Sequence, residues 1–183
     1  MDSSTLHRAL QRAGVETATG LAGEEVERIE AEFSFLFPPD LRSFLEQAVP
    51  VSPGWADWRA PDRDALKKRL EWPYEGMRFD IEHNGFWMDG WGPRPKNMSD
   101  RFETAHRAVG VAPTLIPIVG YRYIPERPHQ SGNPVFSVHQ TDIIDYGVDL
   151  ADFFANEVPQ AFGRAGYVLG RDPRPIEFWS ELG

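Results

Sequence analysis

The chain has 183 residues and no cysteine. This absence excludes disulfide bonds, thiolate zinc sites, iron–sulfur clusters and cysteine nucleophiles, and it fits a reducing compartment. The sequence also lacks a run of the about eighteen apolar residues that a membrane-spanning helix needs. Its first ten residues, MDSSTLHRAL, contain no apolar signal region. We therefore expect a cytoplasmic protein that does not bind a membrane.

Lysine is scarce, with only Lys67, Lys68 and Lys96, and the 28 acidic residues outnumber the 19 basic ones, giving a formal net charge of −9. Such a field repels phosphate backbones and anionic lipids and attracts basic surfaces. We expect no nucleic-acid binding and, if the protein has a protein partner, a basic one. The alternative is that the charge serves solubility alone.

Sequence motifs for catalysis are also missing. The chain contains no G-x-S-x-G, H-E-x-x-H, G-x-x-x-x-G-K-[ST] or G-x-G-x-x-G. The five histidines are scattered, and the closest grouping is His139 with Asp142, which strand alternation would place on opposite faces. We therefore predict no metal site, no cofactor and no catalytic residue. The histidines are His7, His83, His106, His129 and His139.

One group of acids leaves an enzymatic alternative open. Asp80, Glu82 and His83 precede a stretch rich in aromatic residues, and such mixtures also occur in sugar-binding clefts. Most acidic residues on a helix face are solvated, however, and aromatic residues beside glycines usually cover the edge of a core. A small hydrolase is therefore the less favoured interpretation.

Aromatic residues are plentiful, at 13% of the chain with six Trp and twelve Phe, and they supply large side chains for a core. Apolar residues at helical spacing, with capping residues and prolines at the ends, predict six helices in the first 110 residues. The segment Phe86–Asn97, rich in glycine and proline, is predicted to be an ordered loop. The predicted helices run from Ser3 or Ser4 to Ala13, from Ala22 to Phe33, from Pro38 or Pro39 to Ala48, from Asp62 to Glu71, from Pro73 to about Gly85, and from a Ser99 cap to about Gly110.

From Leu115 the apolar period changes to two, which indicates strands. Pro117 interrupts the first strand, an interruption that is tolerated at a sheet edge or at a bulge. Asp149 is predicted to cap a helix to Asn156, and Pro175 to open a last short helix. Residues 1–183 thus predict a single α+β domain, with strands at Leu115–Val119, around Tyr121–Tyr123, at Pro134–His139 and at Thr141–Tyr146.

Arg122 lies between Tyr121 and Tyr123, and strand alternation places it on the face opposite both rings. If the tyrosines face the core, Arg122 faces away from it. There it can pair with Asp142 or Asp145 across the sheet, or it can line a partner surface.

Four segments together resemble the SUKH superfamily, which includes the fungal cell-wall-assembly and killer-toxin-resistance regulators and many bacterial immunity proteins. They are FPPDLRSFLEQA, LIPIVGYRYIPE, GNPVFSVHQTDIIDYG and DLADFFANE, and the resemblance covers residues 22–157. It implies one α+β domain with a curved antiparallel sheet packed by N-terminal and C-terminal helices. It also implies a non-enzymatic binding protein, most often an immunity protein that neutralises a toxin, or alternatively an intracellular regulatory scaffold.

The charge and the resemblance lead to one hypothesis. An acidic domain presents carboxylates and exposed aromatic residues to a basic toxin effector, so that charge speeds the encounter and the aromatic residues anchor the complex. The predicted contact residues are Trp87, Asp89, Trp91, Arg122, His139 and Asp142.

Overall fold

The computed structural model describes residues 2–183 and confirms the predicted α+β class. Its six α-helices are α1 (Ser3–Arg12), α2 (Gly23–Phe33), α3 (Pro39–Gln47), α4 (Asp64–His83), α5 (Met98–Val111) and α6 (Leu150–Glu157). Its strands are β1 (Thr17–Thr19), β2 (Ala48–Pro50), β3 (Leu115–Val119), β4 (Arg122–Pro125), β5 (Val135–His139) and β6 (Asp142–Gly147). None of the helices within residues 2–183 combines the length and the apolar character needed to cross a membrane.

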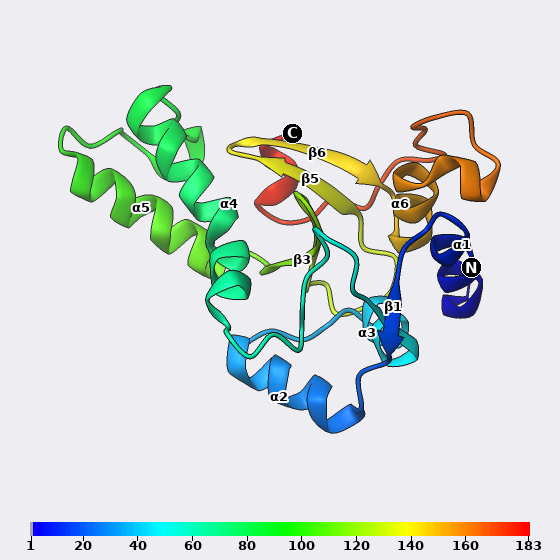
Figure 1. Ribbon diagram of the computed structural model, residues 1–183. Helices are drawn as coiled ribbons and strands as arrows, with labels where there is room; N and C mark the ends of the chain where they lie inside the picture. The colour runs from blue at the N-terminus through cyan, green and yellow to red at the C-terminus, as the bar shows by residue number, and fades with distance from the viewer. Residues whose placement is uncertain (1) are drawn as a thin grey trace.

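The central sheet is an antiparallel meander in the order β3-β4-β5-β6 (Figure 1). Pro117 lies in the edge strand β3, and the register shifts between Pro117 and Val119. Both features confirm the prediction, because an edge strand with a bulge can omit the hydrogen bond that proline cannot donate. A separate two-stranded sheet of β1 and β2 pairs Thr17 with Pro50, and sequence periodicity did not predict it.

Both faces of the central sheet are covered. Ile124 and Tyr123 are neighbours in β4 and therefore point to opposite faces. Ile124 belongs to a large apolar cluster built with helices α1, α2, α3 and α6, in which the rings of Phe44 and Phe154 lie 4.8 Å apart. Tyr123 belongs to a second cluster, where Trp179, four residues before the end of the chain, covers the sheet. Helices from both ends of the chain thus pack on the sheet, as predicted.

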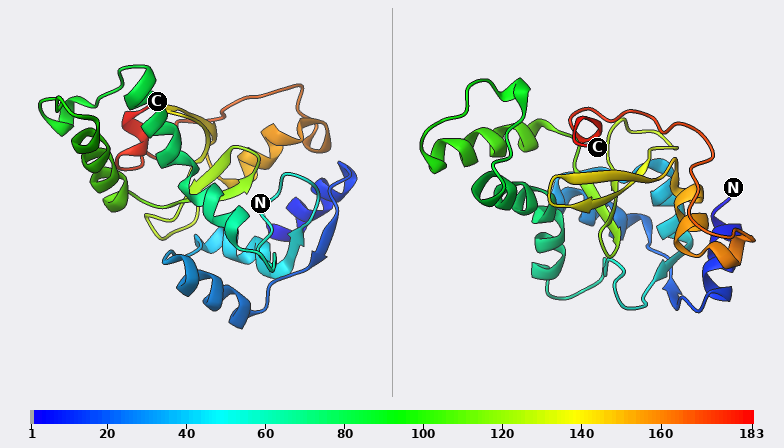
Figure 2. Two further views of the ribbon diagram at one scale, coloured as in Figure 1. Left: turned by 60° about the vertical axis from the view of Figure 1, so that its left-hand side comes forward. Right: turned by 90° about the horizontal axis from the view of Figure 1, so that it is seen from above.

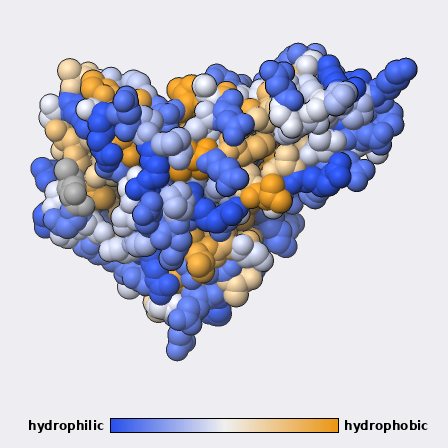
Figure 3. All heavy atoms as spheres, turned by 180° about the vertical axis from the view of Figure 1, so that it is seen from behind, coloured by the Kyte–Doolittle hydropathy of each residue, from blue (hydrophilic) through white to orange (hydrophobic). Residues whose placement is uncertain are grey.

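Helices α4 and α5 run antiparallel and project from the sheet as an arm, which is clearest in the view from above (Figure 2). The apolar cluster between the two helices of the arm contains the buried residues Met77, Ile81 and Ala105, and partly buried aromatic side chains surround them. From behind, the outer end of the arm is mainly hydrophilic, whereas apolar patches lie over the rest of the molecule (Figure 3). The arm therefore has only a small core of its own.

Helix α4 corrects the prediction of two helices separated at Pro73. It is one helix of 20 residues with Pro73 inside it. Proline has no N–H to donate to the carbonyl four residues earlier, that of Arg69. The Tyr123 hydroxyl donates to this carbonyl instead, at 2.9 Å, so the backbone acceptor is satisfied and the helix continues. Three residues after the proline, Gly76 lies so close to the β5–β6 turn that a Cβ there would be 2.7 Å from the Cα of Gln140.

Two predicted helix caps and the last predicted helix are also corrected. Asp2 caps α1, accepting from the Thr5 amide at 2.9 Å, and Asn97 caps α5, accepting from the Asp100 amide at 2.8 Å. In both helices, a side chain one or two residues before the predicted cap accepts the hydrogen bond from the free amide of the first turn. The prediction of a helix from Pro175 is wrong, because only a short 3-10 turn forms, at Trp179–Glu181. The predicted Asp149 cap of α6 is confirmed.

Candidate functional site

Three of the predicted contact residues lie together in the ordered loop between α4 and α5. A 3-10 turn spans Asp89–Trp91, and the indole of Trp87 donates to the carbonyl of Gly92 at 2.8 Å. The rings of Trp87 and Trp91 meet edge to face, with centroids 5.0 Å apart. Trp91 also stacks on Phe178 of the C-terminal segment, at 6.5 Å. Trp91 therefore fixes the loop against the rest of the protein.

This loop forms one side of a cavity of about 370 Å³, which we call the loop pocket. The C-terminal segment supplies the other side. Two aromatic rings and two carboxylates line the pocket, and none of the lining residues found within residues 2–183 is basic. Such a lining suits a cation, which the ring faces and the carboxylates both attract. The lining residues are Phe86, Trp87, Met88, Asp89, Gly90, Glu181 and Leu182.

The two carboxylates of the loop pocket are available to a partner. Asp89 and Glu181 are both exposed. Within residues 2–183, neither forms an ion pair with an arginine, lysine or histidine side chain. Because no internal cation has to be displaced, a basic side chain can approach them directly.

Arg122 is half-buried, and its guanidinium is held by contacts within the protein. Its guanidinium donates to Ser137 Oγ at 2.7 Å, lies 3.7 Å from the centre of the Tyr146 ring, and has Nε 3.4 Å from a Glu157 carboxylate oxygen. The predicted pairing with Asp142 or Asp145 is therefore wrong, because α6 brings Glu157 closer. Only one flanking tyrosine faces the core: Tyr123 is buried, whereas Tyr121 lies before β4 and is 52% exposed.

His139 and Asp142 lie on the same face of the sheet, which corrects the prediction of opposite faces. They belong to two strands and are directly opposed across the β5–β6 turn, so alternation along a single strand does not apply. The exposed His139 meets the ring of Tyr121 at 6.3 Å, and Tyr121 packs on the exposed Trp72 at 5.4 Å. We call these four residues, with the half-exposed Ile144, the hairpin-tip surface.

The acids and histidine considered for hydrolysis do not converge. Asp80 is buried and accepts from the Thr141 amide at 2.9 Å and from the Thr141 hydroxyl at 2.6 Å. Burial alone would raise the pKa of Asp80, but the hydrogen bonds from Thr141 and Asn84 together lower it. Asp80 thus joins α4 to the β5–β6 turn. Glu82 and His83 are exposed, and the His83 ring stacks on Phe79.

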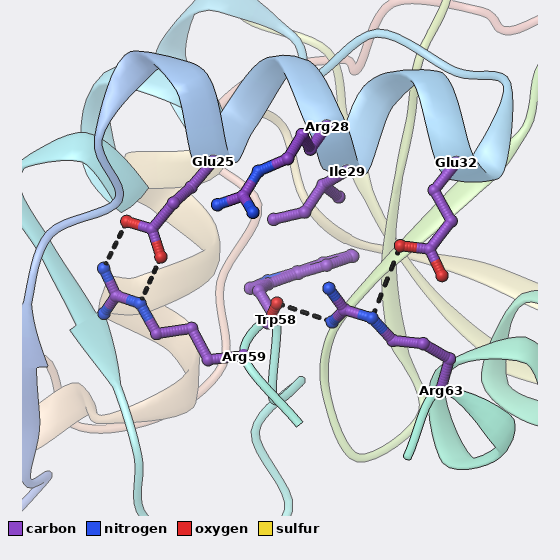
Figure 4. A pocket seen from close by; sticks show the side chains of 7 residues that line it. All are labelled: Glu25, Arg28, Ile29, Glu32, Trp58, Arg59 and Arg63. Carbon is purple, nitrogen blue, oxygen red and sulfur yellow. Dashed lines mark hydrogen bonds and ion pairs between the residues drawn. The ribbon is translucent and has the colours of Figure 1, made fainter. Parts of the chain in front are cut away.

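A second pocket, of about 410 Å³, lies between α2 and the segment that leads into α4 (Figure 4). We call it the arginine pocket. Arg59 donates to both carboxylate oxygens of Glu25, each at 2.8 Å, and this contact lowers the pKa of Glu25 to about 2. Arg63 Nε lies 3.3 Å from Glu32. The pocket is lined by Glu25, Arg28, Ile29, Glu32, Trp58, Arg59 and Arg63.

Sequence reasoning missed the arginine pocket, although one signal was present. Residues 25, 28, 29 and 32 have helical spacing, so they share a face of α2. Three of these four residues are charged, which is typical of a solvated face. Nothing local indicates that residues 58–63 cross that face and turn it into the wall of a pocket.

No protein-family model, curated protein or solved structure matches the chain. Within residues 2–183, no three His, Cys, Asp or Glu side chains are grouped so that they could hold a metal ion.

Proposed function

We propose that this protein is a non-enzymatic binding protein that recognises a basic protein partner through the loop pocket. The observation that carries the proposal is the combination of the aromatic rings of Phe86 and Trp87 with the unpaired carboxylates of Asp89 and Glu181. A lysine or arginine side chain of the partner enters this pocket, where the carboxylates neutralise it and the ring faces attract it.

The charge of the whole chain supports the same choice of partner. With 28 acidic and 19 basic residues, the protein attracts a basic surface over a distance and raises the association rate. Aromatic side chains then supply the contact area that anchors a complex. The hairpin-tip surface, with its exposed Trp72 and Tyr121, is a second contact area of this kind.

We infer further that the partner is a toxin effector, which the protein neutralises by direct binding. The SUKH resemblance of residues 22–157 supports this inference, since bacterial members of that superfamily are most often immunity proteins. A regulatory scaffold with cellular partners is the alternative function that the same resemblance allows.

Where a toxin gene lies beside the gene for this protein, the test is co-expression of the two, together with a binding measurement on the purified pair. We expect wild type to permit growth. We expect Asp89→Asn with Glu181→Gln to weaken binding about tenfold or more and to restore toxicity, because two charge-assisted contacts are lost. Glu82→Gln with Glu103→Gln is the matched control, because it also removes two carboxylates, both of them exposed and outside the pocket.

Each of the possible results has a clear meaning. Full toxicity in the presence of well-expressed wild type would reject the immunity function. Equal weakening by the pocket variant and by the double control variant would reject the loop pocket and leave only a general charge effect. Trp72→Ala, measured in the same way, reports the contribution of the hairpin-tip surface.

A further inference from the structure

We propose that the arginine pocket binds the phosphate or carboxylate group of a small anionic molecule. This site is separate from the loop pocket that we propose for a basic partner. Its surplus charge is positive, whereas that of the loop pocket is negative. Three features of the pocket favour such a ligand: its charge balance, the donors that its arginines leave free, and its apolar floor.

The charge balance favours an anion. Three arginines and two glutamates line the pocket, which leaves one surplus positive charge in a chain whose net charge is −9. Arg59 is neutralised by Glu25 and Arg63 by Glu32. The surplus charge therefore belongs to Arg28, and an anion is the ligand that would balance it.

Unused donors point in the same direction. The only hydrogen bond of the Arg28 side chain within residues 2–183 is from Nε to the Glu24 carbonyl, at 3.3 Å, so both terminal nitrogens are free. Arg63 uses Nη1 on the Trp58 carbonyl at 2.7 Å and turns Nε to Glu32, which leaves Nη2 free. The planar fork of a guanidinium matches two oxygens of a carboxylate or phosphate group.

The walls of the pocket are held in place before any ligand arrives. Arg59 donates to the carbonyls of Thr19 at 2.6 Å and Gly20 at 2.8 Å in addition to Glu25. These contacts fix the segment after β2 against the start of α2. Binding therefore requires the ordering of little more than the Arg28 side chain.

The floor of the pocket is apolar. The ring of Trp58 lies beneath Ile29 in the centre of the site, with Arg59 and Arg63 on either side (Figure 4). Trp58 and Ile29 are almost fully buried, so they limit the access of water from below and strengthen ionic contacts in the pocket. The volume of about 410 Å³ lies within the range of small-molecule sites.

The experiment titrates the full chain at low ionic strength with inorganic phosphate, pyrophosphate and citrate, and follows the heat of binding and the melting temperature. We expect saturable binding of at least one of these anions, with a Kd below about 1 mM and a rise in melting temperature. Binding of the phosphates alone identifies a phosphate site, and binding of citrate alone identifies a carboxylate site.

Arg28→Gln is the decisive variant, because Arg28 is exposed and forms no ion pair within residues 2–183. We expect it to weaken binding about tenfold or more with little change in the melting temperature of the free protein. The matched control is Arg107→Gln, which removes an exposed arginine from α5. No saturable binding of any of the three anions, or equal weakening by the two variants, would overturn the proposal.

Discussion

The sheet with its covering helices and the α4–α5 arm are stabilised in different ways. The main cluster around the sheet contains 21 buried apolar residues, whereas the cluster inside the arm contains three. Polar contacts to the sheet compensate in the arm: Asp80 binds Thr141, and Tyr123 binds the Arg69 carbonyl. The position of the loop pocket thus depends on these directional bonds and on the stacking of Trp91 on Phe178, whereas the stability of the fold depends mainly on the apolar volume of the main cluster.

The largest expected loss of stability comes from the cluster between the central sheet and its covering helices. Phe44 is fully buried, stacks on His7 at 4.1 Å and packs against Phe154. Phe44→Ala should lower the free energy of unfolding by about 3–5 kcal/mol, measured by chemical denaturation. Phe79→Ala, in the arm, removes the same ring from a side chain that is 45% exposed and should change stability by about 0.5 kcal/mol or less. Similar losses in the two variants would contradict the contrast.

The next effect sharpens the contrast at the base of the arm. Asp80→Ala removes a charged acceptor from Thr141 and Asn84 and should cost about 2–3 kcal/mol. It should also speed hydrogen exchange at the Thr141 amide, because that amide loses its partner. The control is Glu82→Ala, which removes an exposed neighbour. Unchanged exchange at Thr141 would show that Asp80 does not hold the arm.

A smaller effect concerns a single hydroxyl. Tyr123→Phe keeps the buried ring but leaves the Arg69 carbonyl without its donor, at a cost of about 1–2 kcal/mol in the free energy of unfolding. Tyr121→Phe changes the exposed neighbour and should have almost no effect. Equal stability of the two variants would mean that solvent replaces the missing hydroxyl.

The smallest effect concerns how the stability of the cluster around the sheet depends on pH. Burial lowers the pKa of His7, whose Nδ1 has no partner within residues 2–183, whereas Nε2 lies 2.9 Å from the Phe44 carbonyl oxygen. Below about pH 6.5 the unfolded chain takes up this proton more readily than the folded protein, so stability falls as the pH falls. Melting temperatures from pH 7.5 to 5.5 should drop more in wild type than in His7→Gln. Parallel curves would exclude His7 as the cause.

Sequence reasoning succeeded where the determinants are local. The helices that became α2 and α3, the Asp149 cap and the edge position of Pro117 follow from spacing and from backbone chemistry within a few residues. It failed where a segment far away in the sequence determines the local structure. The hydroxyl that lets α4 pass through Pro73 comes from β4, and the arginine pocket needs residues 59 and 63 to cross α2.

The same distinction holds for the predicted contact residues. Trp87, Asp89 and Trp91 were found together because they lie in one short loop. The grouping of Arg122 with His139 and Asp142 was only partly correct. The strand register places His139 opposite Asp142, whereas Arg122 lies beside Glu157 of α6. Residues within one loop therefore have neighbours that the sequence predicts, whereas the neighbours of residues on strands depend on distant segments.

The contact between Tyr123 and the Arg69 carbonyl has a consequence for how this fold can diverge. A relative with any other residue at position 73 would donate its own amide to that carbonyl, and a phenylalanine at position 123 would then serve equally well. Evolutionary replacements at these two positions, fifty residues apart, are therefore expected to be correlated. We therefore expect relatives that keep Pro73 to keep Tyr123 as well.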